Sequence, residues 1–218
     1  MVEGQGSYLK DADGKQYLDF LAGIAVNALG HNHPKVTAAI AEQAAKLVHC
    51  SNFYWIEPQV QLAEKLITNS VLDKVFFGNS GAEANEGAIK LARKYGEKKF
   101  ANKKYKVLTL EHSFHGRTIT TVKATGQASF HKSAFAPYPE GFSYTKEIAD
   151  LYNAIDDETV AVMIELVQGE GGVKAFAKQE IQELAQFLKE KEILLIIDEV
   201  QSGVFRSRRR TVPLHPVF

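Results

Sequence analysis

The sequence predicts an α/β fold in which a mostly parallel sheet is flanked by helices. Two uninterrupted apolar runs, at residues 193–197 and 160–164, are typical of strands covered on both faces. Segments with helical periodicity alternate with such runs, and this alternation favours parallel pairing. Each run ends in a carboxylate, Asp198 or Glu165, at the strand end beyond which ligands bind in open α/β sheets. On this segment alone, Asp198 is either a functional carboxylate or part of a solvated acidic turn.

The composition limits the classes of protein to which the chain can belong. Its 218 residues, 45% of them hydrophobic, suffice for one large domain or for a domain and part of another. Lys+Arg and Asp+Glu both number 26, so no global charge favours nucleic acid or an anionic membrane as a partner. Cys50 is the single cysteine, and residues 1–6 lack a signal-peptide pattern. We therefore expect a cytoplasmic protein with a small-molecule partner.

The first third of the chain is predicted to form a hairpin followed by two helices. The predicted elements are β-prone runs at 7–9 and 16–20 around a turn at 11–15, and helices at 34–47 and 57–69. His31 and His33 lie before the first helix. They are either metal ligands or braces of a loop, and the lack of a cysteine or carboxylate at ligand spacing favours braces.

A helix start near residue 81 is the first candidate ligand site. The predicted elements are a strand at 74–77 and a helix that ends near Gly96. Ser80 and Glu83 have the spacing of a capping box, which is a structural role. Gly81 and Ala82 carry almost no side chain, so their backbone N–H groups are open to a phosphate. The two interpretations are compatible.

A predicted strand at 105–110 ends close to an aromatic side chain and a guanidinium three residues apart. Phe114 is suited to stacking on a planar ring, and Arg117 to holding a carboxylate with two parallel hydrogen bonds. The alternative is a core phenylalanine and a surface arginine. His112 and His115 suggest half of a metal site, but a third ligand is missing.

The strand exits together suggest one cofactor. The remaining predicted elements are a loop at 124–143, a short helix at 146–154, a strand at 160–165, a glycine-rich loop at 168–172 and a helix at 178–191. The exits then offer a phosphate cradle, a stacking aromatic, an arginine and carboxylates. Pyridoxal 5′-phosphate needs this set, because its phosphate suits a helix N-terminus, its ring stacks, and its pyridinium nitrogen pairs with a carboxylate.

Several motifs, in one order along the chain, resemble those of the subgroup-III aminotransferases, a group of fold-type I pyridoxal-phosphate enzymes. The motifs are YLDF (17–20), GIAVNALGH (23–31), NSGAEANE (79–86), SFHGRT (113–118), QGEGG (168–172) and DEVQ (198–201). The likeness runs from about Gly6 to Gly203 and is closest to the branch that uses acylated ornithine. It implies a large cofactor-binding domain with a mostly parallel sheet, an N-terminal part of a small domain, and a missing C-terminal portion.

The resemblance also implies roles for individual residues. For the cofactor, Gly81 and Ala82 would hold the phosphate, and Phe114 and Val200 would cover the two ring faces. Asp198 would pair with the pyridinium, and Gln201 would bond the phenolic oxygen. For the substrate, Arg117 would bind the α-carboxylate, and Glu165 and Glu170 would lie nearby. The implied reaction moves the terminal amino group of N2-acetylornithine, or a similar donor, to 2-oxoglutarate in arginine biosynthesis. The implied assembly is a homodimer, and no metal is implied.

The likeness divides the chain into three segments. Residues 1–48 would contribute to the small domain, residues 49–205 would form part of the large domain, and residues 206–218 would be a basic tail foreign to the family. Arg93 and Arg117 are the only arginines before residue 206, whereas residues 206–218 contain four arginines and no lysine. This change of composition suggests a different reading frame. The alternative is a tail that binds nucleic acid.

Two classes of function stay open. One is an aminotransferase or a truncated copy of one, and the other is an inactive module that binds a phosphate-bearing ligand or a partner subunit. Family members hold the cofactor through a lysine that lies well beyond the carboxylate matched by Asp198, whereas Lys191 is the last lysine here. We therefore expect that the chain as written does not transaminate.

Overall fold

The structure, a computed structural model, describes residues 1–204 and 206. Contacts within the chain form two compact units, the first comprising Met1–Thr68 and the second beginning at Asn69. Among the described residues, no helix is both long enough and apolar enough to cross a membrane.

The three segments predicted from the sequence stay predictions, because a division by contacts does not assign the domains of a family. The basic tail predicted for residues 206–218 lies outside the described residues, apart from Arg206.

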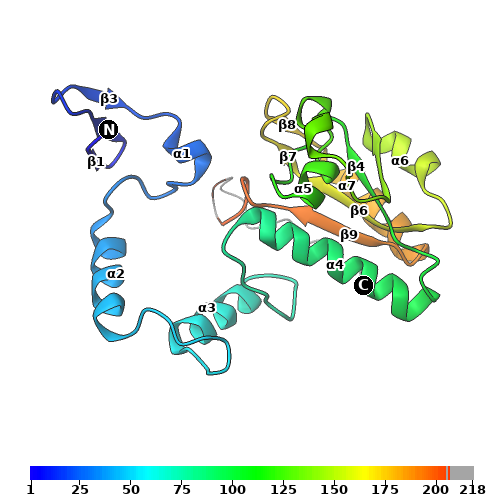
Figure 1. Cartoon of the computed structure of the whole chain (residues 1–218), viewed down its shortest axis with the longest axis horizontal. Coiled ribbons are helices and arrows are strands. Elements are labelled where there is room, and N and C mark those ends of the chain that lie inside the picture. Colours follow the sequence, from blue (N-terminus) through cyan, green and yellow to red (C-terminus); the bar gives the residue numbers. More distant parts are fainter. Residues whose placement is uncertain (205, 207–218) are drawn as a thin grey trace. The chain divides into compact units, whose positions relative to one another are not determined.

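The N-terminal unit consists of a small antiparallel sheet followed by helices (Figure 1). Its elements are β1 (Glu3–Gln5), β2 (Tyr8–Lys10), β3 (Gln16–Leu18), α1 (Ala22–Ala25), α2 (Pro34–Lys46) and α3 (Glu57–Thr68). Asp11 Oδ1 accepts the backbone N–H groups of Asp13 and Lys15, which closes the turn between β2 and β3. The predicted hairpin and the two longer helices are confirmed.

The helices of this unit bury none of their side chains. Large apolar side chains between α2 and α3 are exposed instead, with Val48 at 84%, Phe53 at 92% and Trp55 at 93%. Exposed apolar surface of this extent is typical of segments that pack against further polypeptide.

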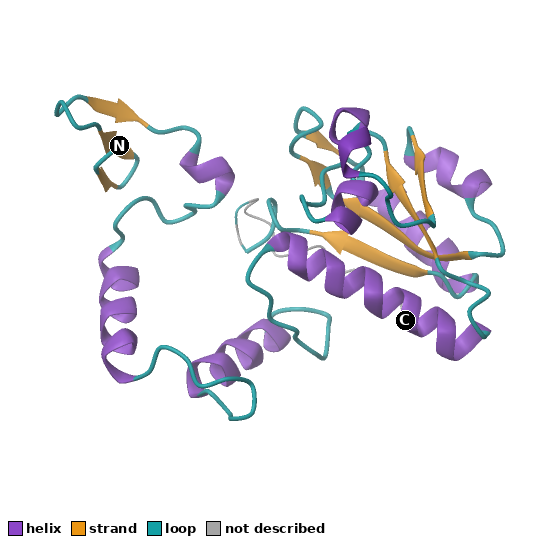
Figure 2. Cartoon of the chain, in the orientation of Figure 1, coloured by secondary structure: helices purple, strands orange, loops and turns teal. Residues whose placement is uncertain are grey.

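The second unit is built on a four-stranded parallel sheet with the strand order β5-β4-β6-β9. The strands are β4 (Lys106–Leu110), β5 (Phe142–Thr145), β6 (Thr159–Glu165) and β9 (Leu194–Asp198), and the helices are α4 (Gly81–Phe100), α5 (Ile119–Ala124), α6 (Ile148–Ala154) and α7 (Lys178–Glu190). A separate antiparallel pair joins β7 (Val167–Gln168) to β8 (Lys174–Ala175). The predicted α/β class with a parallel sheet between helices is confirmed, as Figure 2 shows.

Alternation along the strands gives the sheet two buried faces. Val162 and Ile164 of β6 belong to a cluster with the apolar side chains of α6 and α7. Ala161 and Met163 belong to a second cluster that contains Ile89 and other side chains of α4. Successive strand residues point to opposite faces, so a strand covered on both sides must be apolar throughout. This explains the uninterrupted apolar runs of the sequence.

Two sequence predictions about this unit are wrong. Residues 74–77 form no strand: no described strand pairs with them, and Phe76 is 76% exposed. Gly96 does not end its helix, since α4 continues to Phe100 and Ala101 adopts the left-handed conformation instead. A Cβ at Gly96 would lie 2.0 Å from the carbonyl oxygen of Lys104, so this glycine permits a close backbone contact.

Residues 124–143, predicted as a loop, also contain regular structure. They contain two short 3₁₀ turns and lead directly into β5, an edge strand that the sequence analysis missed. The strand sequence FSYT is short and half polar, which is why its periodicity gave no signal.

Candidate active site

Asp198 ends β9 and lies beside the end of β6, where Glu165 is its register partner. Because parallel strands point the same way, their carboxyl ends meet at one edge of the sheet. Asp198 is 7% exposed and Glu165 is 6% exposed. Asp198 is therefore a buried carboxylate rather than part of a solvated turn.

Three donors satisfy the Asp198 carboxylate. His115 Nδ1 and Asn85 Nδ2 each lie 2.8 Å from Oδ2, and the backbone N–H of Val200 donates to Oδ1 over 3.0 Å. Burial alone would raise the pKa of Asp198, but the hydrogen bonds from His115, Val200 and Asn85 outweigh it and lower the pKa. Asp198 is thus held as an anion at neutral pH.

Glu165 has the opposite electrostatic character. Burial, with a smaller contribution from the negative charge of Asp198, raises the pKa of Glu165 to about 7. Its Oε2 atom accepts the backbone N–H of Phe114 over 3.1 Å. Glu165 therefore fixes the backbone at the aromatic residue that was predicted to stack.

The loop after β4 places Phe114 and Arg117 together. The Arg117 guanidinium lies over the Phe114 ring, 5.4 Å from the centroid, and Phe130 meets the same ring edge-on at 5.5 Å. Phe114 is half-buried and Arg117 is exposed. The alternative thus describes Phe114 only in part, whereas the surface position that it proposed for Arg117 is the one in the structure.

The first turn of α4 packs against two segments of the site, the one that follows β9 and the loop after β4. A Cβ at Gly81 would lie 2.6 Å from Val200 Cγ1, and a Cβ at Gly116 would lie 2.8 Å from the Ala82 Cβ. The Ser80 side chain accepts the N–H of Glu83, as the capping interpretation requires. The Ser80 cap uses the N–H of Glu83 and not those of Gly81 and Ala82. A capping role for Ser80 is therefore compatible with phosphate binding at Gly81 and Ala82.

The glycine-rich loop after β6 approaches the same edge. Gln201 Oε1 occupies the space that a Cβ on Gly169 would fill, at 1.4 Å from that position. Gln168 Nε2 donates to the carbonyl of Glu111 over 3.0 Å, which ties this loop to the exit of β4. Glu170 is exposed on the loop.

Two side chains of this cluster were not assigned to the site by the sequence analysis. Asn85 was treated only as part of a motif, and His115 was considered only as half of a metal pair. His115 is 1% exposed, and its Nε2 atom is buried without a hydrogen-bond partner in the described structure. The available signal was the helical spacing of Asn85, one turn beyond Gly81 on the same face of α4.

These residues fit a planar aromatic cofactor with a basic ring nitrogen and a phosphate. The buried anionic Asp198 suits a protonated ring nitrogen, the half-buried Phe114 suits a ring face, and the N-terminus of α4 suits a phosphate. The Nε2 atom of His115, in the same cluster, has no hydrogen-bond partner among the described protein groups.

The fold matches that of pyridoxal-phosphate aminotransferases over about half their length, and comparison with known families identifies the class. The chain belongs to the class-III aminotransferase family, whose model matches residues 1–209. It is 53% identical over 208 residues to the acetylornithine aminotransferase of Wolinella succinogenes, covering 94% of this chain and 53% of that protein. It is 50% identical to the enzyme of the same name from Caldanaerobacter subterraneus, covering 95% and 53%. The chain thus spans about half the length of these curated relatives.

Solved structures show the same fold relationship. The ornithine aminotransferase from Toxoplasma gondii superposes with a TM-score of 0.89 at 30% identity, over 95% of this chain and 50% of that one. The N-acetylornithine aminotransferase from Stenotrophomonas maltophilia superposes with a TM-score of 0.77 at 36% identity, over 92% and 50%.

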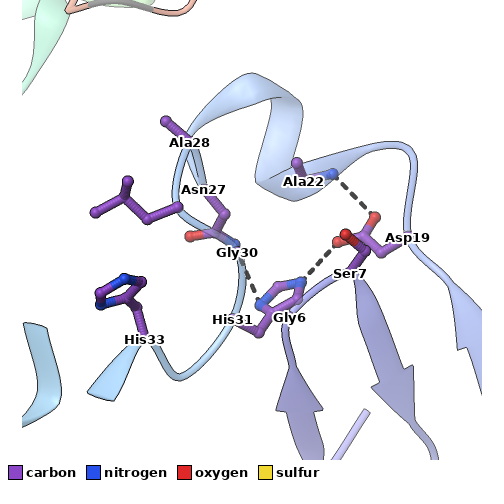
Figure 3. Close-up of a pocket in the computed structure, with 10 residues that line it drawn as sticks. Gly6, Ser7, Asp19, Ala22, Asn27, Ala28, Gly30, His31 and His33 are labelled. Carbon is purple, nitrogen blue, oxygen red and sulfur yellow. Dashed lines mark hydrogen bonds and ion pairs between the residues drawn. The ribbon is translucent and has the colours of Figure 1, made fainter. Parts of the chain in front are cut away.

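The N-terminal unit contains a separate cavity of about 470 Å³ around His31 (Figure 3). His31 Nε2 lies 2.7 Å from Asp19 Oδ2, and its Nδ1 lies 3.3 Å from Asn27 Nδ2. Asp19 Oδ1 also accepts the N–H of Ala22. Both ring nitrogens of His31 therefore hold the loop 19–31, as the brace interpretation proposed, whereas Nδ1 of His33 is buried without a hydrogen-bond partner in the described structure. Ala22 and Ile24 of this loop adopt left-handed backbone conformations.

Proposed function

We propose that the protein is the cofactor-binding part of an aminotransferase that moves the terminal amino group of N2-acetylornithine to 2-oxoglutarate with pyridoxal phosphate. The observation that carries this proposal is the buried Asp198, ionised by three donors beside Phe114 and the start of α4. The acetylornithine aminotransferases among its relatives suggest the substrate. One similar structure, an ornithine aminotransferase from Toxoplasma gondii, has partial occupancy of PLP at its active site.

The residues of the site would bind different groups of the cofactor. Pyridoxal phosphate, when bound, supplies an electron sink for the carbon that loses its proton. Asp198 would hold the ring nitrogen protonated, and Gln201 would donate to the phenolic oxygen. The Gly81 and Ala82 N–H groups would bind the phosphate.

The side chains around the ring would orient it and the substrate. Phe114 and Val200 would exclude water from the two ring faces. Arg117 would bind the substrate α-carboxylate in a forked pair of hydrogen bonds. Glu165 and Glu170 would form an acidic side of the substrate pocket. The active assembly would be a homodimer, as expected from the resemblance.

A second candidate function is a catalytically inactive fragment that binds a phosphate-bearing ligand or a partner subunit. Lys191, the last lysine of the sequence, follows α7 and precedes the first residue of β9. Asp198 lies at the other end of β9, so Lys191 belongs to the opposite edge of the sheet from the proposed ring site. We therefore propose that this chain alone lacks the lysine that holds the cofactor covalently.

The test is to purify the chain, add pyridoxal phosphate, reduce with borohydride and map any modified lysine by mass spectrometry. The same sample is assayed for turnover of acetylornithine with 2-oxoglutarate. We expect saturable binding of the cofactor, no specific modification of one lysine, and no turnover. A specific adduct together with turnover would show that another lysine serves, and would overturn the proposal of an inactive fragment. Absence of any cofactor binding would overturn the proposed ring site.

A further inference from the structure

Asn85 joins three segments that are distant in the sequence. It lies in the second turn of α4 and is 6% exposed. Its Nδ2 atom donates to Asp198 Oδ2 and to the backbone carbonyl of His115, each over 2.8 Å. An amide NH₂ has two hydrogens, so both bonds can be made at once. The start of α4, the loop after β4 and the end of β9 thus share one group.

The helix gains nothing from asparagine at this position. Ile89 and Ala92, which follow on the same helical face, are both buried in the apolar cluster. Asparagine is a poorer helix former than alanine or leucine, and a buried amide is costly unless it is hydrogen-bonded. The two bonds of Asn85 are therefore what compensates for a polar side chain on this apolar stripe.

We propose that Asn85 is a positioning residue that fixes the Asp198 carboxylate and the loop carrying Phe114 and Arg117 to the phosphate-binding end of α4. This inference rests on the proposed function, because it concerns the mutual geometry of the ring, phosphate and carboxylate sites. Asn85 itself is placed behind Asp198 and needs no contact with the cofactor.

The groups that face Asp198 determine what its loss would do. His115 faces it from the loop after β4, Glu165 from the end of β6, and Asn85 from α4. Glu199, the next residue along the chain, is a further carboxylate within electrostatic reach of Asp198. Removal of Asn85 leaves His115 as the side-chain donor to Oδ2, and Glu165, whose pKa is raised to about 7, is protonated where Asp198 titrates and adds no charge repulsion there. A carboxylate with fewer donors is a weaker acid, so Asp198 should bind its proton more tightly.

The first experiment follows the titration of Asp198 in the whole 218-residue chain without cofactor. Aspartate carboxyl carbons are labelled with ¹³C, the Asp198 signal is assigned with Asp198→Asn, and its shift is recorded against pH. Asn85→Leu keeps the shape of the side chain and removes both donors. In this variant we expect the acid dissociation constant of the Asp198 carboxyl group to fall about ten-fold, which is the effect of losing one hydrogen bond to a charged group. Asn85→Asp changes it in the same direction and serves if the leucine variant does not fold.

Ile89→Val is the matched control, because it perturbs the buried face of α4 one turn further on without touching Asp198. It should leave the titration of Asp198 within two-fold of the original chain. Equal titrations of Asp198 in the Asn85 variants and in this control would overturn the inference.

The second experiment measures the affinities for pyridoxal phosphate and for inorganic phosphate by calorimetry. Asn85→Leu should weaken pyridoxal phosphate at least five-fold more than it weakens phosphate, because only the former needs Asp198. Equal weakening of both ligands would overturn the link between Asn85 and the ring site. If the original chain binds neither ligand, the proposed function fails, and the titration of Asp198 still decides whether Asn85 positions it.

Discussion

Glu165 and Asp198 are neighbouring carboxylates with opposite proton affinities. The pKa of Asp198 is lowered because its hydrogen bonds outweigh the effect of burial, whereas burial raises the pKa of Glu165 to about 7. Two like charges in register at adjacent strand ends repel each other, and a proton on Glu165 relieves that repulsion. At neutral pH the pair therefore carries less than two negative charges.

The pKa of Glu165 predicts how stability depends on pH. The folded chain binds this proton more tightly than the unfolded chain, so its free energy of unfolding should fall as pH rises from 4.5 through about 7. The loss attributable to Glu165 is up to about 3 kcal/mol. Glu165→Gln keeps an acceptor for the Phe114 N–H and should not show this loss. Urea unfolding of both proteins at pH 5 and pH 8 measures the difference.

Glu170→Gln is the control, since Glu170 is an exposed glutamate on the neighbouring loop. It should follow the original chain at both values of pH. A constant stability difference between Glu165→Gln and the original chain across this range would show that Glu165 is ionised throughout.

The carboxylates at the strand ends could be predicted from the sequence, whereas the side chains that hydrogen-bond to Asp198 could not. Asp198 and Glu165 each follow an apolar run, so their position at the ligand edge of the sheet could be predicted locally. Asn85 and His115 carry no such signal, because they meet Asp198 only across 113 and 83 residues of sequence. The helical spacing of Asn85 from Gly81 could place it on the same face of α4, but it could not reveal the contact with Asp198.

At the scale of elements, the start of α4 and the segment after β9 are fitted to each other through Gly81. A Cβ at this position would lie 2.6 and 2.8 Å from the two methyl carbons of Val200. Such a distance is far inside van der Waals contact, so an added methyl group must displace either the helix start or Val200. The backbone N–H groups proposed to bind phosphate would move with the helix.

We predict that Gly81→Ala weakens inorganic phosphate binding about ten-fold, the cost of misplacing one hydrogen bond to a charged ligand. Gly81→Ala combined with Val200→Ala should recover most of the affinity, because the clashing methyl groups are removed. Calorimetry on the two variants and on Val200→Ala alone measures this. Failure of the second substitution to restore binding would show that Gly81 matters through something other than Val200.

Gly96 and Gly87 of α4 provide a matched pair for testing close packing. A Cβ at Gly96 would meet the Lys104 carbonyl oxygen at 2.0 Å, whereas one at Gly87 would meet only the exposed Phe76 ring at 3.2 Å. Gly96→Ala should destabilise the chain by about 2 kcal/mol or more despite the better helix propensity of alanine. Gly87→Ala should be neutral or stabilising by up to about 1 kcal/mol. Thermal unfolding of both variants checks the contrast, and equal effects would contradict it.

Among the strands of the second unit, sequence patterns predicted best those whose burial is complete within the chain. β6 and β9 have apolar neighbours on both faces, and their runs were recognised. Residues 74–77 have the pattern of a strand, but a strand also needs a neighbour for its backbone groups, and none of the described strands supplies one. Propensity alone could not reveal that missing partner.

At the scale of the whole molecule, the two units differ in how much apolar surface they bury. The second unit contains both buried clusters, whereas the helices of the first unit bury no side chain. Apolar side chains that stay in water contribute no hydrophobic stabilisation, so the first unit gains stability mainly when further polypeptide covers it. The proposed homodimer would provide such cover.

Trp55 allows this to be tested, because it is the only tryptophan of the chain and is 93% exposed. We predict that the chain self-associates, and that the fluorescence of Trp55 shifts to shorter wavelength as concentration rises, since association moves the indole ring out of water. Light scattering of the same samples gives the mass, and acrylamide quenching gives the accessibility of Trp55. Trp55→Ala, which removes one large apolar side chain, should weaken the association measurably by scattering, whereas Lys103→Ala, a charge change on the exposed turn after α4, should not. A rise in mass without any change at Trp55 would place the contact elsewhere, and a chain that stays monomeric would refute association through this surface.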